Sequence, residues 1–246
     1  MINNRYGIIN YGNNCYLNAI IQLFLSHKET SNIINEYLDI ENNLIYPKKL
    51  LDKLKNKLNI NIQNDSQEVF ILILDIIPEL EKYFNNEVKN TFKCLECNSY
   101  RHKKDTFSTF FVHTESLENS VIELIKNENY NLECDKCKMT TNTNKVCNIK
   151  KLGEILIFYN VLKQKLKISE NIKYSNKKYK LTGLIKHYGS QSSGHYIFID
   201  YLSKLVIDDT NISPISNISL SDIYLLFYTL ETTKYKLNNN NNINSG

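Results

Sequence analysis

The spacing of apolar residues divides the chain into three zones. Residues 1–85 carry apolar positions every three or four residues, which predicts amphipathic helices, notably after Cys15 and across residues 63–80. Residues 86–150 show short alternating stretches, many threonines and two pairs of cysteines. Residues 151–237 are rich in Ile, Val, Tyr and Phe and predict β-strands. No internal repeat and no linker rich in Pro, Gly or Ser separates the zones, so we expect lobes of one domain.

We expect this single domain to span residues 1–237, and the polar, low-complexity residues 238–246 to form a disordered tail. A chain of 246 residues with 42% hydrophobic residues can bury a core. The formal net charge of +4 is too small to indicate nucleic-acid binding. The longest apolar stretch, residues 69–77, contains Asp75 and has half the length of a membrane span. With no signal-peptide pattern, we expect a soluble monomer in the cytoplasm or nucleus and no membrane partner.

An irregular turn rich in Asn and Gly leads into the predicted helix at Cys15. Gly12, Asn13 and Asn14 can adopt positive φ angles or cap a helix. A thiol at the N-terminus of a helix experiences the positive end of the helix dipole and unpaired N–H groups, which favour the thiolate. Cys15 is therefore a candidate nucleophile of a cysteine hydrolase, the alternative being an ordinary buried helix cysteine.

The candidate base is His195. It begins an apolar strand-like segment and precedes Asp208 and Asp209, the first of which lies thirteen residues downstream. A β-hairpin would bring one of these carboxylates beside the imidazole, where it would fix the tautomer and stabilise the imidazolium.

Donors for a developing oxyanion are available in the turn that precedes the helix. Asn10, Asn14 and the backbone N–H of Cys15 are placed for this purpose. For Asn10, the alternative is a turn residue that hydrogen-bonds its own backbone.

Two Cys-x-x-Cys pairs, separated by 36 residues, occupy the second zone. They are Cys94 with Cys97 and Cys134 with Cys137. Four thiolates in two such turns are the ligands of a closed, tetrahedral structural zinc site. Asn98, after the first pair, tolerates the left-handed backbone that such turns often need. Disulfides are the alternative, but they are rare in a reducing compartment. The sequence therefore predicts a structural Zn²⁺.

Taken in order, these segments resemble the ubiquitin-specific proteases. The resemblance is carried by GIINYGNNCYLNAIIQLF (7–24), QNDSQEVF (63–70), the two Cys-x-x-Cys pairs, HYGSQSSGHY (187–196), IDD (207–209) and the closing LSDIYLLFYTL (220–230). It implies an α+β fold, that of a papain-like cysteine protease. In that fold residues 1–85 would form a helical thumb, residues 86–150 zinc-bearing β fingers, and residues 151–237 a β palm.

The same resemblance implies a role for each residue that matches the motif. Cys15 matches the nucleophile, His195 the base and Asp208 the acid that orients the base. Asn10 matches the side chain that stabilises the oxyanion. Asp209 matches a second polar residue that assists in some members.

Residues that contact the substrate are implied in the same way. Asp65 and Glu68 align with residues that hold the arginine-bearing tail of ubiquitin, but the residues alone favour helix capping, and the two roles can coexist. Gly194 and Tyr196, on the two sides of the candidate base, match positions beside that tail. The chain departs from the family where a His-Leu-Lys-Arg pattern is usual, since residues 160–164 read NVLKQ.

We therefore expect an enzyme, a thiol-dependent deubiquitinating peptidase that acts on ubiquitin or ubiquitinated proteins and contains structural zinc. One alternative is a protease for another ubiquitin-like modifier with a Gly-Gly tail. A second is a non-catalytic ubiquitin-binding scaffold of the same fold. A third is a zinc-ribbon protein that binds nucleic acid, which the mild net charge disfavours.

Overall fold

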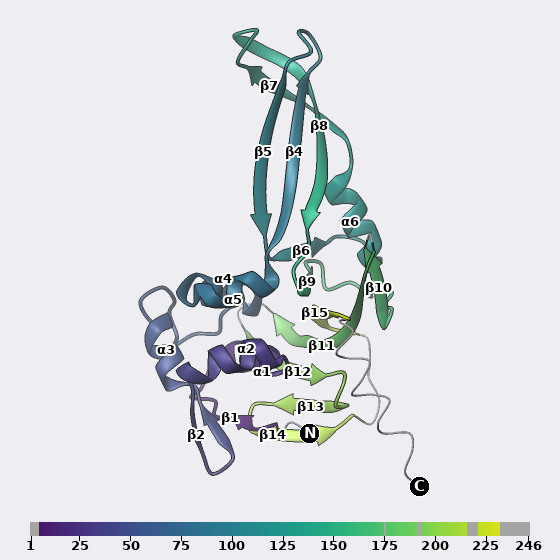
Figure 1. The fold of residues 1–246 in the computed structure, drawn as a ribbon. Coiled ribbons are helices and arrows are strands. Elements are labelled where there is room, and N and C mark those ends of the chain that lie inside the picture. Colours follow the sequence, from purple (N-terminus) through teal and green to yellow (C-terminus); the bar gives the residue numbers. More distant parts are fainter. Residues whose placement is uncertain (1–4, 175, 191–192, 216–220, 232–246) are drawn as a thin grey trace.

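The chain forms a helical lobe with a small sheet, a tall four-stranded sheet and a central sheet of eight strands (Figure 1). The structure, a computed structural model, describes residues 5–174, 176–190, 193–215 and 221–231. The tail predicted at residues 238–246 lies outside the described residues. The mixture of helices and sheets agrees with the predicted α+β fold class. Among the described helices, none is both long enough and apolar enough to cross a bilayer.

The helices predicted after Cys15 and across residues 63–80 are both present. The helical lobe comprises α1 (Cys15–Leu25), α2 (Lys28–Ile34), the 3-10 helix η1 (Asn35–Tyr37), α3 (Lys48–Leu54), α4 (Ser66–Ile76) and α5 (Pro78–Phe84), with the small sheet of β1 (Gly7–Ile8), β2 (Asp39–Glu41) and β3 (Leu44–Tyr46). Pro78 occupies the first turn of α5, where its missing N–H is tolerated, and so separates this helix from α4.

Three phenylalanines from three helices form the centre of the helical lobe. Phe70 lies between Phe24 and Phe84, with ring centroids 6.0 Å and 5.1 Å away, and all three side chains are fully buried. The Phe70–Phe84 pair meets edge to face, an arrangement that the charge distribution of aromatic rings favours. This cluster fixes α4 against α1 and thereby positions the residues at the N-termini of both helices.

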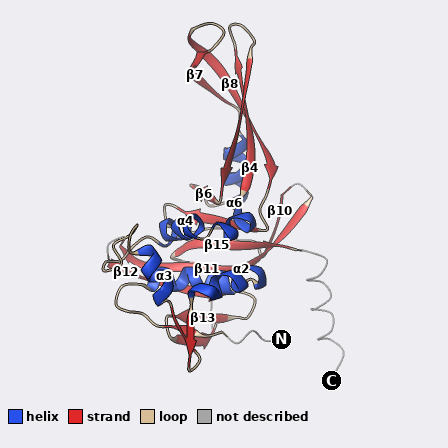
Figure 2. Cartoon of the chain, turned by 60° about the vertical axis from the view of Figure 1, so that its left-hand side comes forward, coloured by secondary structure: helices blue, strands red, loops and turns tan. Residues whose placement is uncertain are grey.

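Antiparallel strands form the tall sheet that rises above the rest of the molecule (Figure 2). In spatial order they are β5 (Tyr100–Phe107), β4 (Asn86–Cys94), β8 (Met139–Lys151) and β7 (Glu128–Cys134). Because Cys94 and Cys134 end their strands, both Cys-x-x-Cys turns lie at the same end of this sheet. Asn98 has the left-handed backbone predicted for it (φ 56°), and Lys138 occupies the equivalent place after the second pair (φ 58°).

The central sheet has the strand order β14-β13-β12-β11-β15-β9-β6, with β10 paired to β11. Its strands are β6 (Thr109–Val112), β9 (Ile155–Asn160), β10 (Asn171–Tyr174), β11 (Lys177–Ser190), β12 (Ser193–Asp200), β13 (Leu205–Asp208), β14 (Asn211–Pro214) and β15 (Ile223–Leu230). Neighbouring strands are antiparallel except for β6 and β9, which are parallel.

Alternating residues of the central sheet belong to two separate cores. On β9, Ile155 and Ile157 pack with the helical lobe, whereas Leu156 and Phe158 pack with α6 (Leu117–Ile125). Side chains alternate between the two faces of a strand, so the helical lobe and α6 cover opposite faces of the sheet. Burial on both faces explains why these strands read as nearly continuous apolar runs.

Residues 109–125 depart from the predicted division of the chain. They fall within the range 86–150 predicted for the fingers, yet β6 joins the central sheet through β9, and α6 packs on the far face of that sheet. The pairing is long-range and parallel, so no local alternation of residues indicates it.

We predict that Phe70→Ala lowers the free energy of unfolding by ~3–5 kcal/mol, because it leaves a cavity between two buried rings. Urea denaturation measures the loss. The matched control is Ile71→Ala on the same helix, where the side chain is 38% exposed and its removal should cost far less. Equal losses in the two variants would show that the aromatic cluster is not the centre of this lobe.

Candidate active site and metal centre

Cys15 is the first residue of α1, as the sequence predicts. The helix begins here because the carbonyl of Asn14 accepts the N–H groups of Leu17 and Asn18, both at 3.0 Å. Residue 15 is only 4% exposed. The backbone N–H groups of Tyr196 on β12, of Tyr16 and of Cys15 itself lower the pKa of its thiol, that of Tyr196 most. The thiol therefore lies at the junction of the helical lobe and the central sheet.

Burial, however, raises the pKa of the Cys15 thiol above its ordinary value, and the negative charge of Asp209 raises it further. The N–H groups of Tyr196, Tyr16 and Cys15 itself act in the opposite direction but do not compensate. The expectation of a thiolate stabilised by the helix N-terminus is therefore wrong for the free protein. Desolvation of the charged form outweighs the hydrogen bonds and the helix dipole.

His195 and Asp208 meet on adjacent strands, as a hairpin would require. Strands β12 and β13 pair antiparallel, and the His195 Nε2 donates to Asp208 Oδ1 at 2.6 Å. Both side chains remain about two-fifths exposed, at 42% and 44%. Because Nε2 is occupied by the carboxylate, Nδ1 is the ring nitrogen left for a proton from a thiol. Among the hydrogen bonds of the described residues, none joins His195 directly to Cys15.

Asp209 hydrogen-bonds to the helical lobe, and one of its carboxylate oxygens also lies within 4.8 Å of a ring nitrogen of His195. Its two carboxylate oxygens accept from Asn10 Nδ2 and Asn18 Nδ2, each at 2.7 Å, and its carbonyl accepts from Ile8 N–H at 2.8 Å. The residue has a left-handed backbone, φ 50°, which turns the chain between β13 and β14. Asn18 was not singled out from the sequence, since an Asn on an apolar helix carries no motif.

The Asn10 side chain forms the turn that the sequence suggests, and it also keeps an N–H that could donate to an oxyanion. Its Oδ1 accepts from Gly12 N–H at 2.9 Å and Asn14 N–H at 3.2 Å, which is the turn arrangement. Its Nδ2 gives one hydrogen to Asp209, so one N–H remains. The Asn14 amide instead donates to Ile9 O and Asn18 Oδ1, and this side chain is buried, so it offers nothing to the site.

Asp65 caps helix α4, the reading that the sequence favours. Its Oδ1 accepts from Gln67 N–H at 2.7 Å and Glu68 N–H at 3.3 Å, while its Oδ2 accepts from the hydroxyl of Tyr224 on β15. Glu68 is exposed on the first turn of the same helix. The Tyr224 contact links α4 to the central sheet, and sequence spacing could not indicate a pairing between residues 159 positions apart.

Gly194 and Tyr196 lie at different depths. The Gly194 N–H donates to Gln63 Oε1 at 2.5 Å, which joins the hairpin of β11 and β12 to the helical lobe. Tyr196 is only 2% exposed, and its ring stacks on that of His187 at 4.0 Å. Its backbone N–H, and not its ring, is what reaches Cys15. Gln63 was quoted from the sequence within a motif but received no role there.

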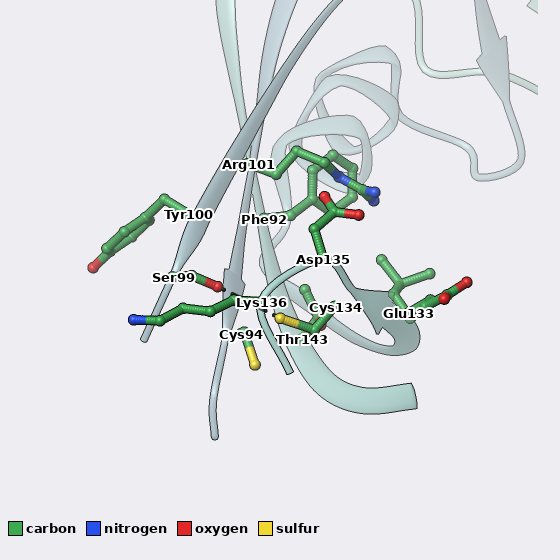
Figure 3. A pocket seen from close by; sticks show the side chains of 11 residues that line it. Phe92, Cys94, Ser99, Tyr100, Arg101, Glu133, Cys134, Asp135, Lys136 and Thr143 are labelled. Carbon is green, nitrogen blue, oxygen red and sulfur yellow. Dashed lines mark hydrogen bonds between the residues drawn. The ribbon is translucent and has the colours of Figure 1, made fainter. Parts of the chain in front are cut away.

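The four cysteines of the two pairs come together at the end of the tall sheet. Their sulfurs all lie within 4.8 Å of one another, with Cys94 and Cys137 3.9 Å apart and Cys97 and Cys134 3.7 Å apart. All six cysteines of the chain are free, so the disulfide alternative is wrong. Figure 3 shows the Cys134 sulfur beside the hydroxyl of Ser99. A dashed line marks the hydrogen bond between them.

These sulfurs fit a metal ion in both geometry and chemistry. A tetrahedral ion with metal–sulfur bonds of ~2.3 Å requires sulfurs ~3.8 Å apart, close to the observed separations. The Cys137 N–H and the Ser99 hydroxyl lower the pKa of Cys134 to about 6, whereas contact with Cys97 and desolvation raise the pKa of Cys137 to about 12. The opposite directions mean that the thiols resist ionising together unless a cation joins them.

The family of the chain follows from its sequence. Residues 39–228 match the family described as ubiquitin carboxyl-terminal hydrolase, and the chain belongs to this family. The matched span includes His195, Asp208 and all four clustered cysteines and begins after Cys15. The resemblance noted from the motifs is thereby confirmed at the level of the family.

A curated relative is ubiquitin carboxyl-terminal hydrolase 8 of Saccharomyces cerevisiae, 26% identical over 203 residues. The match covers 68% of this chain and 37% of that protein. The chain spans less than half the length of the curated relatives it matches.

Solved structures share the fold. One is the SAGA DUB module Ubp8/Sgf11/Sus1/Sgf73 bound to monoubiquitin, with a TM-score of 0.76, 18% identity, and coverage of 94% of this chain and 71% of that chain. The same module bound to ubiquitin aldehyde gives a TM-score of 0.71 with the same identity and coverage. The predicted architecture of helical thumb, β palm and β fingers is therefore the observed one.

We predict that Cys15 of the free protein reacts slowly with iodoacetamide at pH 7. Burial keeps the thiol neutral, so the midpoint of its pH–rate profile should lie above the ordinary thiol pKa of about 8.5. Mass spectrometry of the Cys15 peptide measures the rate. The same peptide in urea serves as the control and should titrate at the ordinary value, while a lower midpoint in the folded protein would contradict the burial argument.

Proposed function

We propose that this chain is a thiol-dependent deubiquitinase that cleaves the bond after the C-terminal glycine of ubiquitin. Membership of the ubiquitin carboxyl-terminal hydrolase family supports the reaction class, and the ubiquitin-bound DUB modules that share the fold support the substrate. The single observation that carries the proposal is the convergence of Cys15, the Tyr196 strand and the His195–Asp208 pair at one junction.

In this mechanism Cys15 is the nucleophile and His195 the general base. The raised pKa of the Cys15 thiol favours proton transfer to His195 Nδ1 during attack over a preformed thiolate. The sulfur then bonds to the carbonyl carbon of the last glycine. His195 returns the proton to the departing amine, which leaves a thioester. Water, deprotonated by His195, hydrolyses the thioester to release the modifier's carboxylate and regenerate the thiol.

The other proposed residues orient these groups or stabilise charge. Asp208 holds the imidazole by Nε2 and stabilises its cation. The remaining N–H of Asn10, together with the backbone N–H of Cys15, would donate to the oxyanion. Asp209 positions the Asn10 amide through a 2.7 Å hydrogen bond and so would act on that donor, and its carboxylate also lies close enough to His195 to influence the base. Because no hydrogen bond joins Cys15 to His195 among the described residues, binding of the tail would complete their alignment.

The modifier's tail would lie between α4 and the hairpin of β11 and β12. Asp65 and Glu68 contribute negative charge on the first wall, where a basic tail residue would be attracted. Gly194, on the second wall, presents a backbone N–H that an extended tail could use in place of Gln63. Tyr196 would serve through its backbone, since its ring is buried.

Zinc is the metal we propose for the cluster of four cysteines. Thiolate ligands in a closed tetrahedral set select Zn²⁺, and such a site serves folding and not catalysis. Cys94, Cys97, Cys134 and Cys137 would thus hold the tips of β4 and β7 together at a distance from the thiol of Cys15.

The proposed activity is tested with ubiquitin that carries a thiol-reactive group at its C-terminus. We expect a covalent adduct that peptide mass mapping places on Cys15, because a positioned base and bound tail activate this buried thiol. Cys15→Ala should abolish the adduct and retain ubiquitin binding, whereas the matched variant Cys147→Ala should be labelled like the native chain.

Other outcomes point to other functions of the same fold. Labelling by a probe built on another ubiquitin-like modifier, with none by the ubiquitin probe, would move the substrate to that modifier. Ubiquitin binding without any adduct would indicate a non-catalytic scaffold. An adduct on a residue other than Cys15 would remove the nucleophile from the proposal.

Zinc should be present at about one ion per chain, measured by elemental analysis of the purified protein. Cys97→Ser and Cys137→Ser should each lose it and lower the thermal midpoint, since structural zinc contributes on the order of 10 kcal/mol to folding. Cys147→Ser, on strand β8 but outside the cluster, is the control and should keep the ion. Metal-free protein with four reduced thiols would contradict this assignment.

A further inference from the structure

A lysine contacts the β11–β12 hairpin near its turn, close to the proposed catalytic residues. Lys163 follows β9, in the segment where the chain departs from the family pattern, and its backbone is left-handed with φ 50°. Its Nζ lies 2.7 Å from His187 Nδ1 and 3.2 Å from the carbonyl of Gly189, to which it donates. It also lies 5.7 Å from the ring centroid of Tyr224. An ammonium group has three N–H donors, and here the ammonium contacts two acceptors on β11 of the central sheet.

His187, the acceptor of this lysine, is a buried and neutral imidazole. It is 1% exposed, and desolvation together with the charge of Lys163 lowers the pKa of His187 to about 4. A neutral ring can accept at Nδ1, whereas a protonated one would repel the ammonium. The bond therefore holds at physiological pH, and the imidazole is fixed by it.

The fixed ring contacts the strand that carries the site. His187 stacks on Tyr196 with ring centroids 4.0 Å apart and an angle of 3° between planes. The two residues also pair directly across β11 and β12. The backbone N–H of Tyr196 in turn acts on the Cys15 sulfur across the packed contact of β12 with α1 and lowers the pKa of the thiol. A continuous chain of contacts thus runs from the Lys163 ammonium to the thiol.

The turn end of the hairpin is held on both of its strands. Gly189 and Gly194 pair across the hairpin, and Lys163 holds the carbonyl of the first while Gln63 holds the N–H of the second. An exposed lysine with chance contacts would not combine a left-handed backbone, a buried acceptor and a second acceptor in the same hairpin. A non-glycine residue in that backbone region is uncommon and is maintained by its surroundings.

We propose that Lys163 is a positioning residue for the thiol of Cys15, acting through His187 and the stacked ring of Tyr196. Without the ammonium, the buried Nδ1 of His187 loses its partner, and the imidazole is free to turn away from the tyrosine. The Tyr196 N–H then holds the sulfur less well. The inference rests on the proposed function for its kinetic readout only, since the state of the thiol can be followed without any substrate.

The test compares Lys163→Met, which keeps the length of the side chain and removes the donor, with Lys163→Arg, which keeps donors. In the Met variant the midpoint of the pH–rate profile for iodoacetamide alkylation of Cys15 should rise by ~0.5–1 unit, because a hydrogen bond to the thiolate is weakened. Turnover of a fluorogenic ubiquitin C-terminal substrate should fall about tenfold, mostly in kcat. The Arg variant should restore both, and Lys165→Met, at an exposed lysine nearby, should change neither.

The other groups that face the sulfur do not change in these variants. They are the Asp209 carboxylate and the backbone N–H groups of Tyr16 and Cys15. A shift in the alkylation profile therefore reports the Tyr196 contact. A folded Lys163→Met protein with the native profile and native kcat would overturn the proposal.

A second variant covers the case in which Lys163→Met does not fold. His187→Phe preserves a ring for stacking and removes the acceptor, so it should give the same upward shift. In the double variant the two shifts should not add, because both changes break one interaction. Additive shifts, or no shift in His187→Phe, would overturn the proposal.

Failure of the proposed function would look different. If the native protein turns over no ubiquitin substrate while Lys163→Met still shifts the alkylation profile of Cys15, the positioning role stands and the hydrolase activity fails. If turnover is measured but neither variant moves the profile, the hydrolase activity stands and the positioning role fails.

Discussion

The carboxylate of Asp209 joins the two sides of the candidate site, and the geometry of the rest depends on it. Its oxygens hold Asn10 and Asn18, which belong to the helical lobe, whereas the residue itself belongs to the turn after β13 in the central sheet. The preceding residue, Asp208, holds the imidazole of His195. Neighbouring positions of one turn therefore contact both His195, the proposed base, and the helix that begins at Cys15, the proposed nucleophile. A displacement of this turn would move both together, which preserves their relation.

Burial governs the thiol as much as charge does. A helix N-terminus offers Cys15 hydrogen-bond donors, yet the packing that delivers the Tyr196 N–H also removes water from the sulfur. The same contact between lobes thus stabilises the thiolate and penalises it, and the penalty is larger. A neutral thiol is less exposed to oxidation and to unwanted nucleophilic reactions. In the proposed mechanism the sulfur stays unreactive until His195 accepts its proton.

The sequence predicts features whose cause is local and misses those whose cause is long-range pairing. Apolar repeats indicate the helix after Cys15 because a helix shows its period within a few turns. The Cys-x-x-Cys pairs indicate their own site, since each turn supplies two ligands by itself. The interaction of Lys163 with His187 depends on where β9 ends relative to β11, strands separated by β15 in the sheet. The sequence predicts a thiolate at Cys15 from the helix dipole, and this prediction is wrong. Burial decides the pKa of the thiol, and the spacing of residues does not reveal burial.

The crowding around Gly194 limits how this protein could be re-engineered. A Cβ placed there would lie 2.3 Å from the carbonyl oxygen of Tyr188 and 2.4 Å from Nε2 of His187, so any larger residue displaces the backbone. Position 194 therefore does not accept a residue larger than glycine without a shift of the backbone. Tyr188, which is 41% exposed on the same hairpin, remains free to change. Changes in what the proposed site accepts would have to arise from such neighbours, around a glycine that the packing fixes.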